Sequence, residues 1–528
     1  MLRGILTVGG WTLVSRVLGF ARDMLIAARL GAGPVADAFF VALRLPNLFR
    51  RLFGEGAFNA AFVPSFSGVL AAEGPETARD FAEQAFAGMI LILGLLTIAG
   101  EVFMPQVMLG LAPGFAAIPA KFALAVTLSR LTFPYLLLIC LAALVSGMLN
   151  GLDRFTAASA SYVLFNVVTI AALLWLTPYM ASAGHALAVG VAASGVAQLG
   201  VLLVAVRRVG MGLRLRRPRL TPQMRTLMRR MAPGLVGAGV TQLNLAVDVI
   251  IASLLPAGTV SVLYYADRVQ QLPLGVIGTA VGTAMLPLLS RQVRTGEVQA
   301  AEDTQNRAIE YALFLTLPAA LALMVAAGPI VGVLFGRGRF GHADVVLSAH
   351  ALSAYALGLP AFVLVKVLAP GFFARGDTAT PVKIGVGAVV LNLALNIAFM
   401  RPLQQMGPAL ATSLAAMVNL ACLGIVLARR GHLRFDAALR RRAPRMLLAA
   451  VAMAAVLLGT RHMLAGALAE RGMVRWLGLC ALVAAGAASY FAALPLTGAY
   501  GARQALGLLA RRRLRPAGGS AITPGTET

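Results

Sequence analysis

Cysteine, lysine and acidic residues are scarce in this chain, and each shortage excludes a class of protein. Among 528 residues there are 3 cysteines, too few and too scattered for a disulfide framework or a zinc site. No HExxH motif occurs, and none of the lysines, Lys121, Lys366 and Lys383, follows the glycine of a Walker A phosphate loop. We therefore expect no enzyme and no ATP hydrolysis by the chain itself.

Long apolar runs, in contrast, fill most of the sequence. Hydrophobic residues make up 59% of the chain and mean hydropathy is +0.83. The runs are about 20 residues long, as membrane helices require, and they lack the short alternating strands of an outer-membrane barrel. The fold class is therefore an all-α polytopic membrane protein. The first run starts near Ile5 and has no small-residue cleavage site, so we expect a retained helix.

We predict fourteen transmembrane spans. They lie near residues 5–30, 36–66, 82–110, 122–149, 157–177, 185–206, 231–254, 261–289, 311–334, 345–373, 382–400, 407–428, 445–467 and 473–495. Most Lys and Arg fall in the termini and the even-numbered loops, which predicts that both termini are cytoplasmic. The basic clusters at 207–230 and 429–445 are interpreted as topology signals that also contact anionic membrane lipids; we expect no nucleic-acid partner despite the net charge of +25.

Four landmarks recur at a nearly constant offset, which indicates an internal repeat. Their pairs are Gly33 with Gly258, Pro64 with Pro287, Pro134 with Pro360, and Asp153 with Asp377. Six spans fit in each period, so the halves should be parallel six-helix bundles around a central cavity. We predict an N-terminal bundle at 1–220, a second bundle at 221–430, an accessory helix pair at 431–500 and a cytoplasmic tail at 501–528.

Charged residues inside the first span mark a candidate site, because burying charge in a bilayer is costly. At helical spacing, Arg16, Gly19 and Asp23 form one stripe, and Ser15, Gly19 and Arg22 form its neighbour. Both stripes meet at Gly19, where a bend or a close substrate contact would fit.

The second span carries a similar face. Asp37, Arg44 and Arg51 recur every seven residues, and Glu55 follows four residues later. Pro46 should kink this helix and turn its arginines toward a wet interior. Other ionisable residues within spans are Asp248, Arg268 and Lys366.

Two interpretations of these charges remain open. They can be structural ion pairs, such as Arg16 with Asp23 or Arg268 with Asp267 or Asp248, that fix helix packing. Alternatively, the basic excess in the first two spans binds an anionic ligand, and the planar guanidinium suits phosphate. The chain has 42 Arg against 3 Lys, so the position of each arginine is more informative than its identity.

Several motifs resemble the MurJ/MviN lipid II flippases. They are SRVLGFARD at 15–23, DAFFVA at 37–42, LPNLFRR at 45–51, GEGAF at 54–58, APGF at 112–115, YYADR at 264–268, KVLAPGF at 366–372 and TPVKI at 380–384. The resemblance runs through nearly the whole chain in order. It implies a MATE-like exporter of the MOP superfamily that carries lipid II, the undecaprenyl-pyrophosphate-linked peptidoglycan precursor, from the inner to the outer leaflet of the bacterial cytoplasmic membrane.

The resemblance also implies roles for individual residues. The family's functional arginines fall on Arg16, Arg22, Arg50 and Arg268, and its functional acid falls on Asp37. Ser15, Gly19, Asp23, Arg51 and Glu55 would support the cavity or its gate. The accessory helices would form a groove for the polyprenyl tail, and cell-wall synthesis proteins are expected partners.

No resident cofactor is expected, but the resemblance leaves the energy source open between the membrane potential and sodium. The acids that look like sodium ligands are Asp248 and Asp377. The asparagine expected one turn before Asp377 is replaced by Phe373, which speaks against a site there.

Three alternatives stay open at the level of sequence. A flippase for another polyprenyl-pyrophosphate glycan, such as an O-antigen unit, would use the same arginines. A cation-coupled multidrug exporter would favour an acidic cavity. A membrane scaffold that regulates cell-wall synthesis would leave the charged cavity without a purpose.

Overall fold

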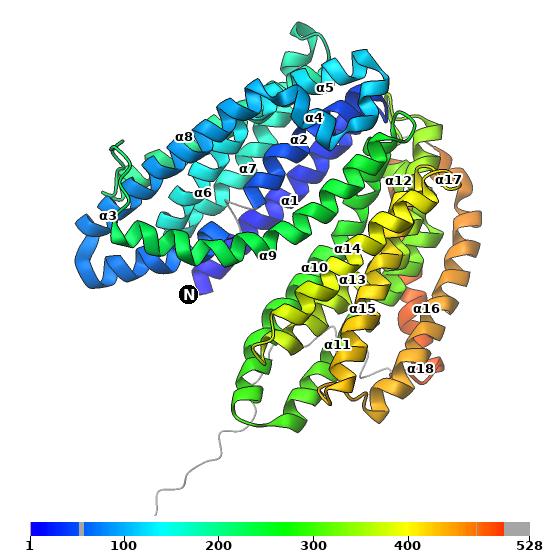
Figure 1. The fold of residues 1–528 in the computed structure, drawn as a ribbon. Coiled ribbons are helices and arrows are strands. Elements are labelled where there is room, and N and C mark those ends of the chain that lie inside the picture. Colours follow the sequence, from blue (N-terminus) through cyan, green and yellow to red (C-terminus); the bar gives the residue numbers. More distant parts are fainter. Residues whose placement is uncertain (1, 52–56, 471, 501–528) are drawn as a thin grey trace, which may run out of the picture.

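In the computed structural model the chain consists of helices and their connections (Figure 1). The structure describes residues 2–51, 57–470 and 472–500, with side chains except at 2–6, 57, 233–241, 243–244 and 276–284. No strand occurs in these ranges, so the all-α prediction is confirmed. Ten of the helices within them are long and apolar enough to cross a membrane. The count of fourteen spans stays a prediction.

The first half of the chain forms one group of helices, which we call the N-lobe. Its elements are α1 (Leu2–Leu30), α2 (Pro34–Phe49), α3 (Ala57–Val102), α4 (Met104–Leu111), η2 (Pro113–Ala117), α5 (Pro119–Thr132), α6 (Tyr135–Gly151), α7 (Phe155–Ala171), η3 (Ala172–Leu176), η4 (Thr177–Tyr179) and α8 (Ala183–Arg208). The helix α6 lies at the centre of this group, and most of its side chains are buried.

The second half forms the C-lobe and an accessory pair. The C-lobe comprises α9 (Pro222–Ser253), α10 (Thr259–Arg294), α11 (Val298–Val325), α12 (Ala327–Phe335), α13 (His342–Phe373), α14 (Ala379–Phe399) and α15 (Met406–Arg429). The accessory helices are α16 (Ala437–Met463), α17 (Ala465–Ala469) and α18 (Met473–Leu496). The helix α16 packs on α11 and α18, so the pair lies on the C-lobe alone (Figure 1).

Each predicted span coincides with a helix or with two consecutive helices, but the breaks differ from those expected. The second span is divided between α2 and α3, and α2 ends at Phe49, three residues after Pro46. The helix α3 joins the rest of that span to the third span across Gly74, whose φ of +86° suits glycine.

Two of the four predicted landmark pairs fall at matching places in the two lobes, whereas Pro134 precedes α6 and Pro360 lies inside α13. Gly33 precedes α2 and Gly258 precedes α10, while Asp153 and Asp377 each lie in a short connection between helices. The predicted boundary at residue 220 falls between α8 and α9. However, α9 contacts both α3 of the N-lobe and α14 of the C-lobe, so it bridges the two.

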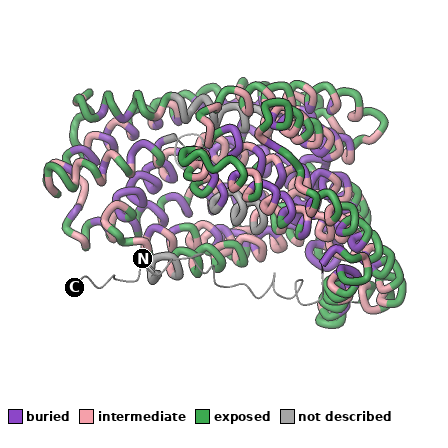
Figure 2. Tube along the Cα trace, turned by 90° about the horizontal axis from the view of Figure 1, so that it is seen from below, coloured by how far each residue is buried: buried purple, intermediate pink, exposed green. Residues whose placement is uncertain are grey.

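The outer surface is apolar where a membrane helix would contact lipid. The most apolar window of α14 is only 11% buried, and Val382, Val386 and Val390 lie exposed along one of its faces. Figure 2 shows exposed residues on the outside of the helices and buried residues between them. Exposed apolar surface on this scale is typical of contact with lipid chains.

Candidate functional site

A cavity of about 660 Å³ lies between the lobes. The two groups of helices meet where α1 ends and α10 begins, and they diverge toward the other end (Figure 1). We call these the closed end and the open end. The residues lining the cavity include seven basic residues, Arg16, Arg22, Arg44, Arg50, Arg51, Arg268 and Lys366, and only two acids, Asp23 and Asp267. This excess of positive charge favours an anionic ligand.

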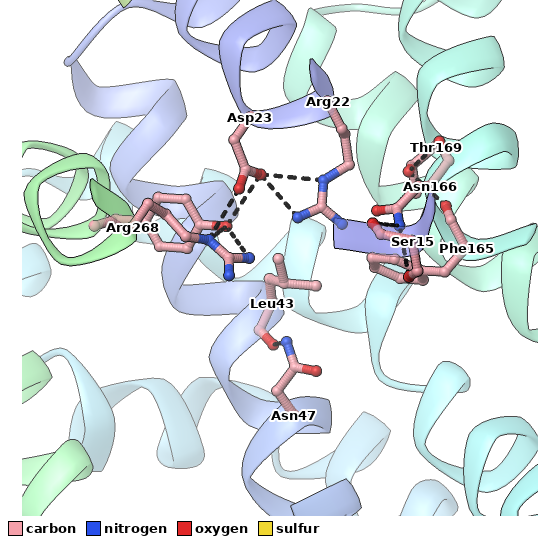
Figure 3. A network of polar contacts seen from close by, with 10 residues as sticks. Ser15, Arg22, Asp23, Leu43, Asn47, Phe165, Asn166, Thr169 and Arg268 are labelled. Atoms are coloured by element: carbon pink, nitrogen blue, oxygen red, sulfur yellow. Dashed lines mark hydrogen bonds and ion pairs between the residues drawn. The ribbon is translucent and has the colours of Figure 1, made fainter. Parts of the chain in front are cut away.

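Asp23 joins arginines from both lobes (Figure 3). Its carboxylate accepts hydrogen bonds from Arg22 Nε at 3.1 Å and Arg22 Nη2 at 2.8 Å, and it lies 2.9 Å from Arg268 Nε of α10. The side chains of Arg22 and Asp23 are 5% and 2% exposed. Asp23 is thus in a buried ion-pair cluster, but its partners are Arg22 and Arg268 and not Arg16, and Arg268 pairs with Asp23 instead of Asp267 or Asp248.

Aromatic side chains hold these two guanidinium groups in place. Arg22 lies over the ring of Phe165, 5.0 Å from its centroid. Arg268 donates to Tyr264 Oη at 2.9 Å, and Tyr264 stacks on Phe40 with ring centroids 3.8 Å apart. One carboxylate and three aromatic rings thus orient two arginines toward the same cavity.

Arg16 lies in the cavity with an exposed side chain, in contrast to Arg22. Its guanidinium fits beside α10 because Gly275 has no side chain: a Cβ there would lie 3.2 Å from Arg16 Nη1. Gly19 does not bend α1, which is continuous through it. Gly19 faces Asn166, which donates to the carbonyl of Ser15 at 3.0 Å; a Cβ at Gly19 would lie 3.5 Å from Asn166 Oδ1, an ordinary contact.

The helix α2 supplies the remaining arginines near the open end. Arg44, Arg50 and Arg51 all line the cavity, and Arg50 Nε donates to Asn47 Oδ1 at 3.2 Å. The predicted turn of these side chains toward the interior is therefore present. Glu55, predicted on the same face, lies outside the described residues.

Asp37 does not line the cavity. It is buried at the closed end, where it accepts hydrogen bonds from the backbone N–H of Gly258 at 2.7 Å and of Ser261 at 2.9 Å, and from Ser261 Oγ at 2.5 Å. Lys121 of α5 lies 2.8 Å from the same carboxylate. Asp37 therefore connects the start of α2 to the start of α10, the equivalent helix of the other lobe.

The closed end is also filled by aromatic residues of both lobes. Tyr265 of α10 contacts Phe335 and Phe340, each with ring centroids 5.1 Å apart, and Phe20 of α1 reaches Phe335 at 5.9 Å. These rings separate the cavity from the surface at this end.

The two predicted sodium ligands do not come together. Asp248 of α9 accepts a hydrogen bond from Asn392 of α14 at 2.9 Å. Asp377 lies before the start of α14, about 20 Å away along that helix, and it pairs with Arg430 at 2.5 Å. Asp377 is thus a structural ion pair and does not face Asp248.

A different set of oxygen atoms surrounds Asp248. Thr412 Oγ1 lies 3.4 Å from its carboxylate, and Asn396 donates to Asn392 Oδ1 at 3.1 Å. The Oδ1 atom of Asn396 is buried and has no hydrogen-bond partner among the described residues. One carboxylate with amide and hydroxyl oxygens is a donor set that suits a hard cation such as sodium. The sequence analysis missed the two asparagines and Thr412, because neutral amides and hydroxyls are common in membrane helices.

Known proteins resemble this chain in sequence and in fold. The family model described as lipid II flippase MurJ matches residues 26–475. A probable lipid II flippase MurJ of Rhizobium meliloti (strain 1021) is 47% identical over 498 residues, which cover 93% of each chain. Another from Rickettsia prowazekii (strain Madrid E) is 34% identical over 451 residues, covering 85% of this chain and 88% of the relative.

Solved structures show the same fold. A lipid II flippase MurJ in an inward closed conformation matches with a TM-score of 0.77 at 24% identity, over 93% of this chain and 98% of that one. An inward-facing multidrug resistance MATE family transporter of the MOP superfamily matches with a TM-score of 0.67 at 15% identity, over 81% and 96%. On the extent of the family match and the identity to its members, this chain belongs to the lipid II flippase MurJ family.

Proposed function

We propose that the protein flips lipid II across the bacterial cytoplasmic membrane by alternating access, without hydrolysing ATP. The observation that carries this proposal is the convergence of Arg16, Arg22 and Arg268 from both lobes on one cavity, in a chain of the MurJ family. A pyrophosphate has the charge and the oxygen geometry to accept paired hydrogen bonds from such guanidinium groups.

The proposed orientation follows from the basic clusters. Both clusters, at 207–230 and 429–445, lie at the open end, so positive-inside logic assigns that end and both termini to the cytoplasm. The structure is then an inward-facing state that admits a headgroup from the inner leaflet. Anionic lipids of that leaflet would contact the same clusters, and cell-wall synthesis proteins are further proposed partners.

The proposed cycle uses Asp23 and Asp37 differently. A bound pyrophosphate competes with Asp23 for Arg22 and Arg268 and neutralises the other arginines, which permits the open end to close. Opening of the other end breaks the bonds from Asp37 to Gly258 and Ser261 and releases the headgroup. Such switching requires that the substrate bind the occluded state more tightly than the open state.

The proposed coupling ion is sodium, bound by Asp248, Asn392, Asn396 and Thr412; the membrane potential would add about 2.3 kcal/mol per charge per 100 mV. Replacing Asp248 with asparagine should abolish any sodium dependence of transport, and Asp377→Asn should preserve it. Sodium-dependent transport that survives in Asp248→Asn would refute this site.

The function is tested by following fluorescent lipid II in proteoliposomes with a membrane-impermeant quencher. The native chain should move the lipid between leaflets, and an Arg16/Arg22/Arg268→Ala variant should not. An O-antigen-type lipid and a cationic dye serve as competing substrates. Movement of either competitor in preference to lipid II would replace the proposal with the corresponding transporter.

A further inference from the structure

A second, almost entirely apolar groove lies on the C-lobe, outside the central cavity. Its volume is about 560 Å³, within the range of sites for small molecules. It is bounded by α11, α13, α15 and the start of α16, which are neighbours in the fold (Figure 1). Its lining includes Leu364, Leu368, Leu420, Gly424, Phe435 and Arg440.

The groove is separated from the central cavity by α13. Leu364 and Leu368 are one helical turn apart and line the groove, whereas Lys366 lines the cavity. Lys366 is two residues from each leucine, about 200° around the helix, so the two spaces lie on opposite faces of α13. A headgroup held by Arg16 and Arg268 could not place its own tail in this groove by a direct path.

The length of the groove matches one leaflet. On α15 it extends from Leu420 to Ala428, which is about 12 Å along the helix. Half of the hydrocarbon core of a bilayer is about 15 Å thick. The groove therefore accommodates the buried part of a chain that enters from the leaflet next to the open end and stops near the midplane.

The mouth of the groove is basic. Arg440 lines it directly, and Arg429, Arg434 and Arg441 lie exposed around the same helix ends. Three acids in this region are already paired: Asp377 with Arg430, Asp436 with Arg307, and Glu310 with Arg307 and Arg442. None of the four exposed arginines forms an ion pair with another described residue, so the mouth carries positive charge that an anionic headgroup can neutralise.

From the apolar lining, the leaflet-sized depth and the basic mouth, we propose that this groove binds one acyl chain of an anionic phospholipid, with its phosphate at Arg440. This lipid site is additional to the cavity, and it does not depend on the identity of the transported substrate. The depth excludes a complete polyprenyl tail, and the charge of the mouth favours phosphatidylglycerol over a zwitterionic lipid.

Gly424 provides the variant that fills the groove. A Cβ at this position would lie 3.8 Å from Leu368 Cδ1, an ordinary contact, so a larger side chain can start there and extend into the groove. Gly387 on α14 is the matched control, because it is exposed and a Cβ there would meet nothing within 4 Å. For the charge, Arg440→Gln is compared with Arg225→Gln in the other basic cluster.

The experiment titrates the purified full chain with dioleoyl phosphatidylglycerol or dioleoyl phosphatidylcholine and counts bound lipids by native mass spectrometry. We expect one phosphatidylglycerol to bind at least tenfold more tightly than phosphatidylcholine. Gly424→Leu should weaken the binding of phosphatidylglycerol at least tenfold, and Arg440→Gln should remove the preference for phosphatidylglycerol over phosphatidylcholine. The controls Gly387→Leu and Arg225→Gln should change neither the affinity nor the preference. Unchanged binding in Gly424→Leu, or equal affinity for the two lipids in the native chain, would overturn the proposal.

A second measurement needs no variant that fills the groove. Phe435 lies half-exposed at the mouth, so Phe435→Trp reports on its occupant. Phosphatidylglycerol with brominated chains should quench the fluorescence of the added tryptophan. Undecaprenyl phosphate should not displace this phospholipid, so the quenching should persist. Displacement by the polyprenyl lipid at equal concentration would assign the groove to the substrate tail and contradict our proposal.

Discussion

At the scale of single residues, the cavity depends on the difference between buried and exposed arginines. Arg22 is 4% exposed and needs Asp23 as a partner, because an unpaired charge in a membrane protein interior is costly. Arg16 is exposed in the cavity and can exchange water for a ligand. The two residues belong to the same helix, yet their removal should have different consequences.

We predict that Asp23→Ala lowers the stability of the protein, whereas Arg16→Ala does not. Loss of Asp23 leaves Arg22 buried without its carboxylate, which should cost about 3 kcal/mol and lower the Tm in detergent. Arg16→Ala should retain the native Tm and weaken lipid II binding about ten- to hundredfold, as expected for one lost hydrogen bond to a charged group. Equal Tm losses in the two variants would show that Arg16 also has a structural role.

Sequence alone could predict those residues whose neighbours lie close along the chain. It could not predict residues whose partners lie far away in the sequence. The stripe of Arg16, Gly19 and Asp23 follows from helical spacing within one span, and the structure places all three at the cavity. The partners of Asp37 on α10 lie 221 to 224 residues away and Lys121 lies 84 residues away, so no local pattern contains them. Asp377 was assigned by its place in a motif, although its short-range neighbours gave no sign of the pairing with Arg430.

At the scale of elements, the connection between α8 and α9 is attached to the N-lobe by α3. Glu83 of α3 is buried and accepts a hydrogen bond from the backbone N–H of Arg214 at 2.9 Å, and it pairs with Arg216 at 2.6 Å. Gln84 accepts from the N–H of Arg219 at 2.8 Å. The segment that joins the lobes thus moves with the N-lobe almost to the start of α9.

Glu83→Gln should therefore release this connection. Removing the charge weakens two bonds, and trypsin should cut after the arginines at 214–219 about tenfold faster, since proteolysis follows the population of the locally opened state. Glu76→Gln on an exposed position of the same helix is the control. Identical cleavage rates in native chain, variant and control would mean that Glu83 does not hold the connection.

The pairing of Asp377 predicts a dependence of stability on pH. Hydrogen bonds from Arg430 and Thr380 hold the pKa of the Asp377 carboxyl well below its usual range. Because the pKa is lower in the folded state, the stabilisation is present above the unfolded pKa of about 3.9 and is lost as the pH falls below it. The Tm of the native chain should exceed that of Asp377→Asn by a constant amount from pH 8 to 5, and the difference should begin to narrow below about pH 4.

Helix boundaries were predictable only in part. Hydropathy located each apolar run, because a helix in contact with lipid must be apolar along the whole span. It did not place the end of α2 at Phe49, which falls inside the second predicted span. The predicted connection between the second and third spans does contain a break, at Gly74, where φ is +86°. The helix α1 carries three charges, Arg16, Arg22 and Asp23, near its centre, and these lower its hydropathy there.

At the scale of the whole molecule, the two lobes are joined at equivalent helix starts. Asp37 near the start of α2 accepts hydrogen bonds from Gly258 and Ser261 at the start of α10. Opening this end must break these bonds together, so their strength sets the ratio of the two states. The two related bundles predicted around a cavity therefore also contact each other through equivalent helices.

Ser261→Ala should shift the protein toward the state that is open at this end. It removes the hydroxyl donor at 2.5 Å from Asp37, and a hydrogen bond to a carboxylate is worth about 1.5–3 kcal/mol. Spin labels at Tyr179→Cys of the N-lobe and Arg401→Cys of the C-lobe, in a cysteine-free background, should report a larger population at long distance. Thr316→Ala, which removes a hydroxyl bonded to its own helix, is the control. An unchanged distance distribution would remove Ser261 from the closure.

The main chain itself completes the closure, at four glycines where the lobes touch. A Cβ added at any of these glycines would collide with a backbone carbonyl oxygen of the other lobe. The distances would be 2.2 Å from Gly338 to Ala28, 2.7 Å from Gly31 to Arg339, 2.8 Å from Gly258 to Ala32, and 2.1 Å from Gly114 to Ser253. The backbones of the two lobes therefore approach so closely at these glycines that a side chain would not fit without a shift. A carrier with a cavity of this size would dissipate the proton gradient of its cell if the closed end leaked ions, so we expect this close approach to act as electrical insulation. Their replacement by alanine would harm the cell through leakage even if the lipid still crossed.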